Sequence, residues 1–185
     1  MALPVPLRDS VTPHELEMIA SQQLIEIVPL IAMERTAFIS GAYGPLRPPS
    51  KAKIPLWMAV NLKLKKKCHI IPPQWLSVEH LQDRLAQEVA NPDAFSDLPF
   101  RFTEISKVLL DVASDDLENP DQIRTLLKDL REARQAKSRE GLRHLDHSEL
   151  GLTGLTSMEI NEIRPFFVQS MSLLTKLARN TEATT

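Results

Sequence analysis

The sequence predicts an α+β protein that is mainly α, with a small β-containing N-terminal domain followed by a larger, bundle-like helical domain. Three observations support this prediction. Short β-branched segments, broken by proline and glycine, are concentrated between residues 24 and 71. Apolar residues recur at helical spacing from residue 77 onward. Charge also divides the chain, because residues 35–78 carry eight basic side chains and no acidic one, although the net charge is only −2.

Composition narrows the class of protein. Hydrophobic residues make up 43% and charged residues 25% of the 185 residues, values typical of globular proteins, so the chain should bury a core. The one cysteine, Cys68, has no partner for an internal disulfide, which fits a reducing compartment. The longest apolar run, residues 54–60, is far shorter than the roughly 20 residues of a membrane span. These features predict a soluble intracellular protein.

The small domain is expected over residues 13–72, after a variable extension at 1–12. Thr12, Pro13 and Glu15 are typical of a helix start. The threonine hydroxyl can accept a bond from the third amide of the helix, proline tolerates the first position, and the glutamate can reach back to the cap amide. The domain should therefore open with a short helix.

Strands and a second helix should follow in the small domain. β-branched residues predict strands at 24–28 and 36–40, and three prolines predict a loop at 44–50. We expect a helix over residues 55–66, because proline suits its first turn and lysines suit its negative C-terminal end. A last short strand at 69–71 precedes two prolines, where the domain should end.

The helical domain is expected over residues 73–179, followed by a disordered tail at 180–185. Caps and stop signals predict four helices, which run from Ser77 to Asn91, over 99–113, from Asn119 to Gly141, and from 156 onward. Pro165 should kink or restart the last helix, since a proline inside a helix removes a hydrogen bond and clashes with the preceding turn.

The sequence shows no recognisable catalytic, cofactor or metal site. One polar segment has a His-x-x-His spacing without a further ligand cluster, which favours a loop over a metal site: His144, Asp146, His147 and Glu149. Cys68 and His69 are neighbours on a predicted strand, so their side chains point to opposite faces. Asp115, Asp116 and Glu118 are better explained by turns and helix caps than by a divalent ion.

A lysine cluster is the strongest charged feature, and it consists of Lys63, Lys65, Lys66 and Lys67. Such a cluster can contact phosphates of a nucleic acid or an acidic protein, or it can form a solvated face. Only Trp57 and Trp75 flank it, so a stacking platform for single strands is not evident. A DNA-binding accessory module that uses residues 47–67 is therefore an alternative function.

Several predicted helices carry apolar residues on more than one face. Phe100 and Phe102 belong to one such helix, and Phe166 and Phe167 belong to another. The helical domain expected at residues 73–179 is too small to bury all of that apolar surface by itself. Exposed apolar patches of this kind mark partner surfaces. The pattern predicts a subunit of a larger assembly.

Six segments of the chain resemble the GINS complex subunits, and most closely the second of the partner-of-Sld-five subunits. They occur in family order at residues 44–45, 54–63, 68–75, 109–116, 123–137 and 158–161. The resemblance spans residue 15 to about residue 177. It implies a non-enzymatic scaffold without cofactors that assembles in the nucleus with three other GINS subunits. It also implies association with the MCM hexamer and the Cdc-forty-five factor as part of the replicative helicase, in initiation and elongation of chromosomal replication.

The resemblance assigns candidate roles to particular residues. It places the subunit interface on two helices, at Ile123, Arg124, Leu127, Asp129, Arg134, Met158, Glu159 and Ile160. The apolar pattern described above adds Phe166 and Phe167 to this interface. Trp57, Cys68 and Trp75 are expected to pack the small domain against the helical one. DNA contact by the lysine cluster would be weak or indirect.

Overall fold

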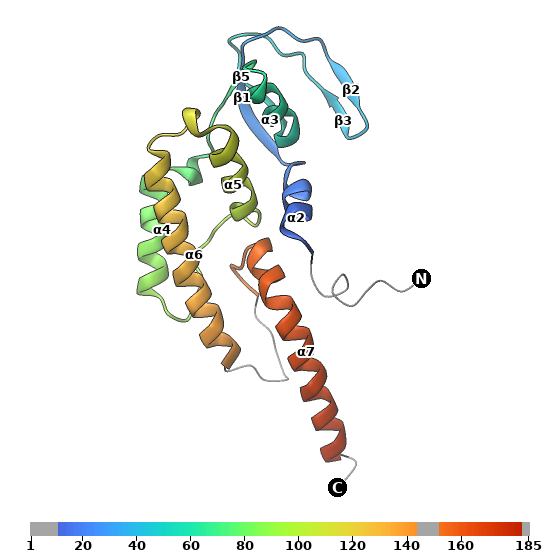
Figure 1. The fold of residues 1–185 in the computed structure, drawn as a ribbon, viewed down its shortest axis with the longest axis vertical. Helices are drawn as coiled ribbons and strands as arrows, with labels where there is room; N and C mark the ends of the chain where they lie inside the picture. Colours follow the sequence, from blue (N-terminus) through green and yellow to red (C-terminus); the bar gives the residue numbers. More distant parts are fainter. Residues whose placement is uncertain (1–10, 144–151, 183–185) are drawn as a thin grey trace.

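The structure is a computed structural model that describes residues 11–143 and 152–182. Figure 1 shows the strands at one end, α4, α5 and α6 beside them, and α7 running away from both. The elements are α2 (Pro13–Ala20), β1 (Leu24–Pro29), β2 (Thr36–Phe38), β3 (Gly41–Tyr43), β4 (Ala52–Pro55), α3 (Leu56–Leu64), β5 (Cys68–Ile70), η1 (Gln74–Leu76), α4 (Val78–Ala90), α5 (Phe102–Val112), η2 (Ser114–Asp116), α6 (Pro120–Arg143) and α7 (Ser157–Glu182). The fold is α+β and mainly α, as the sequence predicts.

The predicted helix start at Thr12 is confirmed. The hydroxyl of Thr12 accepts a hydrogen bond from the Glu15 amide at 3.3 Å, and the Glu15 carboxylate accepts one from the Thr12 amide at 2.8 Å. These reciprocal bonds satisfy amides that have no partner within the helix. Leu16 and Ala20 of this helix are buried, whereas Ile19 is exposed.

Three antiparallel strands form the sheet of the small domain, in the order β4-β1-β5. Ile25 pairs with Ile54, and Ile27 pairs with Ile70, so four buried side chains lie on one face. Strand β4 was not predicted, because its last two residues, Ile54 and Pro55, begin an apolar run whose period does not separate strand from helix. Helix α3 is accordingly shorter than the predicted range of 55–66.

The strand predicted at residues 36–40 is instead the first half of a hairpin. Phe38 ends β2 and pairs with Gly41, which begins β3. Gly41 has a φ of 144°, a conformation that side chains with a Cβ rarely adopt. The predicted strand ends one residue before this glycine, so the sequence pattern did not locate the reversal.

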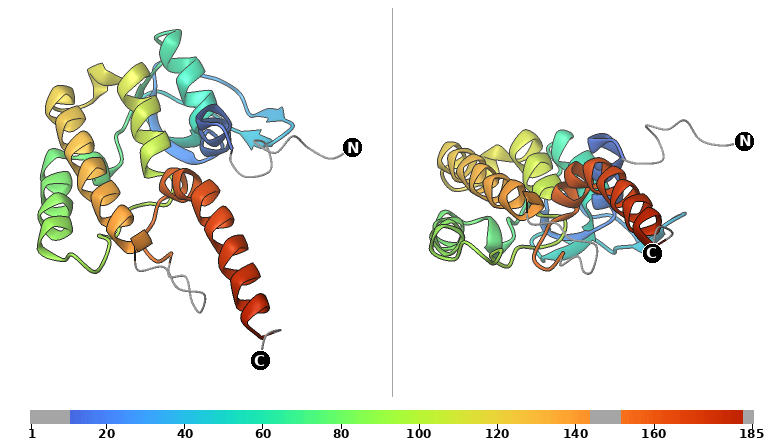
Figure 2. Two further views of the ribbon diagram at one scale, coloured as in Figure 1. Left: turned by 60° about the horizontal axis from the view of Figure 1, so that its bottom comes forward. Right: turned by 90° about the horizontal axis from the view of Figure 1, so that it is seen from below.

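The helical domain follows its predicted caps closely. The Ser77 hydroxyl accepts a hydrogen bond from the His80 amide at 3.3 Å and begins α4. Pro120 is the first residue of α6, where a missing amide hydrogen has no cost. Gly141 does not end α6, which continues to Arg143. Helices α4 and α6 lie side by side in both views of the molecule (Figures 1 and 2).

Helix α7 passes through Pro165 without interruption, so the predicted restart is wrong. Helix formation is cooperative, so one missing bond does not break a helix of 26 residues. Residues 180–182 belong to this helix rather than to the predicted disordered tail. Residues 1–10 of the predicted extension and 183–185 of the predicted tail lie outside the described part of the chain, as does the polar segment at 144–149.

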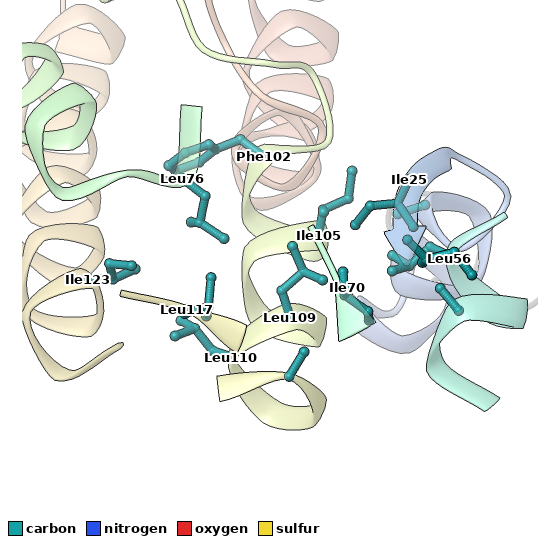
Figure 3. Close-up of a cluster of buried hydrophobic side chains, with 14 of the residues drawn as sticks. Ile25, Leu56, Ile70, Leu76, Phe102, Ile105, Leu109, Leu110, Leu117 and Ile123 are labelled. Carbon is teal, nitrogen blue, oxygen red and sulfur yellow. The ribbon is translucent and has the colours of Figure 1, made fainter. Parts of the chain in front are cut away.

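One hydrophobic core continues through both domains. Figure 3 shows Ile25, Leu56 and Ile70 from the small domain on one side of Ile105 and Leu109 of α5. On the other side of α5 the cluster continues through further side chains of the helical domain, namely Leu76, Leu117 and Ile123. Helix α5 thus packs against the small domain with one face and against the rest of its own helical domain with the other. Burial of both faces holds the two domains together.

Candidate subunit interface

A buried arginine organises the junction of α4, α6 and α7. Arg134 in α6 is 1% exposed, and its Nε and Nη2 atoms bind the two carboxylate oxygens of Glu159 at 2.6 and 2.9 Å. Its Nη1 atom binds Glu88 of α4 at 3.1 Å. Burial alone would lower the pKa of Arg134, but these two carboxylates outweigh it and raise that pKa. Arg134 is therefore a permanent cation inside the chain.

The carboxylates around Arg134 are held by further donors. Glu88 accepts a hydrogen bond from the Lys137 ammonium at 2.6 Å and one from the Ser96 amide at 2.8 Å. Glu159 accepts one from the Thr156 amide at 2.7 Å. Burial alone raises the pKa of both glutamates, but the bonded cations and amides outweigh it and lower their pKa values. The network fixes the first turn of α7 against α4 and α6.

Three of the predicted interface residues are therefore engaged within the chain. Ile123 and Arg134 are almost completely buried in its own core, and Glu159 is bound by Arg134. A side chain that is buried in its own subunit cannot contact a second one. Within the chain, Ile123 and Arg134 therefore belong to internal packing rather than to exposed helix surface.

Three other predicted residues, Arg124, Leu127 and Met158, line a groove between α5, α6 and α7. Leu127 and Met158 are half-buried there, and the groove has a volume of about 350 Å³. Phe102 and Leu110 also line it, so much of its wall is apolar. Arg124 lies at its edge, where it binds Asp121 at 3.0 Å and the Leu110 carbonyl at 3.3 Å. Such an apolar groove with a charged edge can accept a helix of another protein.

The remaining predicted residues lie on exposed or half-buried helix surface. Phe166 is 54% exposed on α7, and Val168 and Leu173 are also exposed there. Phe167 and Ile160 of α7 are half-buried, and Asp129 of α6 is exposed. Figure 2 shows that most of α7 projects beyond the rest of the chain, so its apolar residues have few neighbours of their own. An amphipathic helix in this position needs a partner to bury them.

The Asp116 carboxylate joins the two domains by hydrogen bonds. Asp116 in η2 accepts bonds from the Lys63 ammonium of α3 and the Ile70 amide of β5, each at 2.7 Å. It also contacts His69 Nδ1 at 2.9 Å, and Lys63 binds Asp115 at 2.8 Å. Burial alone would raise the pKa of Asp116, but these donors outweigh it and lower that pKa. Sequence reasoning missed this role, because no local pattern pairs residue 63 with residue 116.

The predicted interdomain residues make mostly local contacts. Trp57 stacks edge-on against Phe38 at 5.2 Å, inside the small domain. The Cys68 thiol faces the Ala59 carbonyl at 3.7 Å, also inside the small domain. Trp75 packs on Phe102 at 5.3 Å within the helical domain and also lines a cavity of about 590 Å³ between the domains. Cys68 and Trp57 nevertheless belong to or pack against the core that continues through both domains, and Trp75 lies at the domain boundary, so their interdomain role stays a prediction.

Two family models match the chain in succession. A model described as the PSF2 N-terminal domain matches residues 12–71, and one described as the GINS complex protein helical bundle domain matches residues 75–178. The chain belongs to the PSF2 family of GINS complex proteins. The two PSF2 family matches leave only residues 72–74 between them.

Relatives across fungi and animals agree with the PSF2 assignment. The chain is 41% identical to a DNA replication complex GINS protein PSF2 of Candida albicans, over all of this chain and 92% of that protein. It is 40% identical to the Schizosaccharomyces pombe protein of the same name over 97% of both chains. It is 34% identical to the Homo sapiens protein of that name, over 90% of this chain and 91% of that one.

The PSF2 fold separates the members of the lysine cluster. Lys63 is 8% exposed and lies between Asp115 and Asp116, whereas Lys65, Lys66 and Lys67 are exposed at the end of α3. The turn that carries them includes Lys66 at a φ of 55°. Lys63 therefore joins the domains instead of facing a nucleic acid, and the exposed cluster shrinks to three cations.

The described part of this PSF2 chain has neither a metal-binding cluster nor a membrane-spanning helix. Over residues 11–143 and 152–182, no three His, Cys, Asp or Glu side chains are placed to hold a metal ion. Within the same ranges, no helix has the length and apolar character of a membrane span.

Proposed function

We propose that the chain is a non-catalytic scaffold subunit of a heterotetrameric GINS complex. Its relatives carry the name of that replication complex, and its surface supports the role. The observation that carries the proposal is the unburied apolar surface of the helical domain, in the groove beside Leu127 and Met158 and along α7 at Phe166. Three sister subunits would cover this surface, because apolar area of this kind favours association.

The proposed complex acts in the nucleus, with the MCM hexamer and the Cdc-forty-five factor, in initiation and elongation of chromosomal DNA replication. A scaffold protein shifts the conformational equilibrium of the MCM hexamer only if it binds the conformations of the hexamer with different affinities. The chain would hold its partners in one arrangement, and ATP hydrolysis would take place in the hexamer. The rigid junction at Arg134 suits this role, because it fixes the direction in which α7 leaves the domain.

The mass of the purified chain in solution tests the proposal. We would measure it by light scattering behind a sizing column, for the chain alone and after co-expression with three sister subunits. The expected result is an aggregating lone chain that becomes a stable one-to-one-to-one-to-one complex. A well-behaved monomer that binds none of the three would overturn the proposal.

Direct DNA binding by residues 47–67 is the rival function, and the exposure of Lys65, Lys66 and Lys67 is the observation in its favour. Replacing these three lysines by glutamine should then weaken binding of a DNA duplex and reduce its salt dependence, while assembly is unchanged. Unchanged DNA binding in these variants would remove this candidate.

A further inference from the structure

A cleft of about 590 Å³ lies between the sheet of the small domain and the helical domain. Its floor is apolar and buried, and consists of Ile25, Leu56 and Ile105. Figure 3 shows Ile25 and Leu56 of the small domain beside Ile105 of α5. Binding pockets of proteins commonly have apolar walls and volumes of roughly 300–1,000 Å³. The cleft thus has the size and the floor of a binding site.

Prolines and a tryptophan form the walls of the cleft. Pro72 and Pro73 connect the two domains, Pro99 precedes α5, and Trp75 lies in η1. Leu24 at the start of β1 also lines the cleft, and its side chain is 60% exposed. Aromatic-lined grooves bind proline-rich segments, which hold the extended polyproline II conformation before binding and so lose little entropy. The walls therefore suit an extended, proline-containing chain.

Three hydrogen-bonding side chains of the cleft have no partner in the protein. Within residues 11–143 and 152–182, the amides of Gln23 and Gln74 and the indole N–H of Trp75 form no hydrogen bond. A polyproline II segment has no internal hydrogen bonds, so its carbonyl groups require donors from outside. The cleft supplies such donors, and an extended segment would use them.

Charge in the cleft narrows the kind of segment. Its charged lining residues are Glu26, Lys51 and Lys53. Lys53 pairs with Glu26 at 3.6 Å, whereas Lys51 is exposed and forms no ion pair in the described part of the chain. One positive charge therefore stays unbalanced beside the apolar floor. An acidic side chain in the occupant complements it.

A single nucleic-acid strand fits this cleft less well. Each of its nucleotides carries a phosphate, so it requires a positively charged groove that follows the backbone. The cleft offers only the unbalanced charge of Lys51, and the Glu26 carboxylate beside Lys53 would repel phosphates.

The cleft is separate from the groove assigned to the sister subunits. Ile105 of α5 lines the cleft, whereas Thr103 and Lys107 of the same helix line the groove. Residues two positions apart project to nearly opposite sides of an α-helix. The cleft therefore stays open when another subunit occupies the groove.

We propose that this cleft between the domains binds an extended, proline-containing segment of another protein, with an acidic residue that pairs with Lys51. Apolar side chains of the segment fill the space above Ile25 and Ile105, and its carbonyl groups accept hydrogen bonds from Trp75 and the two glutamines. This site goes beyond the scaffold function, because it adds a ligand that the four-subunit assembly does not require.

Selection of short random peptides on the purified four-subunit complex tests the proposal. The expected result is enrichment of peptides that contain proline together with aspartate or glutamate. Fluorescence anisotropy then measures the affinity of one enriched peptide. Replacing its acidic residue by lysine should weaken binding to the wild type, and Lys51→Glu should restore part of that loss.

Two conservative variants test the named side chains. Trp75→Phe keeps a ring to pack on Phe102 but removes the N–H donor, and should weaken peptide binding roughly fivefold. Trp57→Phe is its control and should have no effect, because Trp57 packs inside the small domain. Lys51→Gln should weaken binding and reduce its salt dependence, whereas Lys65→Gln, at the end of α3, should change neither. Unchanged thermal unfolding of each variant shows that the fold is intact.

Several results would overturn the proposal. Enrichment of no peptide, or only of peptides without proline or an acidic residue, would show that the cleft does not select this chemistry. Wild-type affinity in both Trp75→Phe and Lys51→Gln would place the peptide elsewhere. An oligothymidine strand that binds the complex and loses affinity in these variants, while the peptide does not, would make the ligand a nucleic acid.

The scaffold function is measured separately in the same preparation. Light scattering reports assembly, and anisotropy reports peptide binding. If the chain forms no complex with the sister subunits, the scaffold function fails, and the same peptides are selected on the full chain alone.

Discussion

Asp116 binds the ammonium of Lys63 at 2.7 Å across the boundary between the two domains. Both side chains are 8% exposed, so the pair lies in a medium of lower polarity than water. The Ile70 amide bonds the same carboxylate, which ties β5 to the turn after α5. The shared core and this pair therefore hold the small domain against the helical one.

Asp116→Asn should loosen that junction. The asparagine keeps the size of the side chain but removes the charge that binds Lys63, which retains only its exposed partner Asp115. We expect the free energy of unfolding to fall by about 1–3 kcal/mol. Urea unfolding of the four-subunit complex measures this change. Asp121→Asn is the control, because Asp121 is exposed, and an equal loss in both variants would contradict the assignment.

The Asp116 carboxylate also predicts a pH dependence of stability. Its pKa in the folded chain is below the ordinary value of 3.8, so folding favours the charged form. The resulting stability is fully present above the pKa of the unfolded chain and is lost as the pH falls through the folded pKa. We would measure the midpoint temperature of thermal unfolding from pH 7 down to about pH 3. This temperature should fall less steeply with decreasing pH in Asp116→Asn than in the wild type. Parallel curves would show that Asp116 is not responsible.

Arg134→Met should be more damaging than the loss of an exposed arginine. It removes the cation bound to the carboxylate of Glu159 and one of the two cations bound to the buried carboxylate of Glu88, and breaking a buried ion pair in this way costs about 3–5 kcal/mol. Arg134→Lys should not restore stability, because lysine cannot bind Glu159 through two nitrogens. Hydrogen exchange should show faster opening at the start of α7. Full stability in the lysine variant would contradict the role of the two-nitrogen contact.

Phe166→Asp and Leu127→Asp should each abolish assembly of the four-subunit complex. A charge placed in an apolar interface without a partner costs several kcal/mol. Light scattering after co-expression measures assembly, and circular dichroism of the variant chain shows whether it still folds. Val89→Asp on α4 is the matched control and should assemble normally. Normal assembly of either test variant would remove that residue from the interface.

Cys68 should resist thiol reagents in the folded chain. Burial raises the pKa of its thiol to about 11, so the thiolate that reacts with such reagents is almost absent at pH 8. Alkylation followed by mass spectrometry should show a slow reaction that accelerates in urea. A fast reaction in the native complex would show that β5 opens readily.

Local chemistry predicted the starts of the helices. Thr12 with Glu15, Ser77 and Pro120 each act on amides within one turn, and the structure has a helix beginning at each of them. Short strands, in contrast, were not located by local chemistry: the strand predicted at 36–40 is half of a hairpin, and β4 was missed. A three- or four-residue strand exists only because a neighbour pairs with it, and the neighbour of β4 lies more than twenty residues away in the sequence.

The sequence by itself determined the fold class, the family and the positions of most helices, because caps, periodicity and signature segments act over short distances. Only the tertiary structure decided which face of each helix is buried. In the structure, Ile123 and Arg134 lie in the core, and Lys63 binds Asp116. Phe166 and Ile39 are exposed to solvent. These outcomes depend on contacts between residues far apart in the chain, and the energy of a charge or an apolar side chain is set by those neighbours.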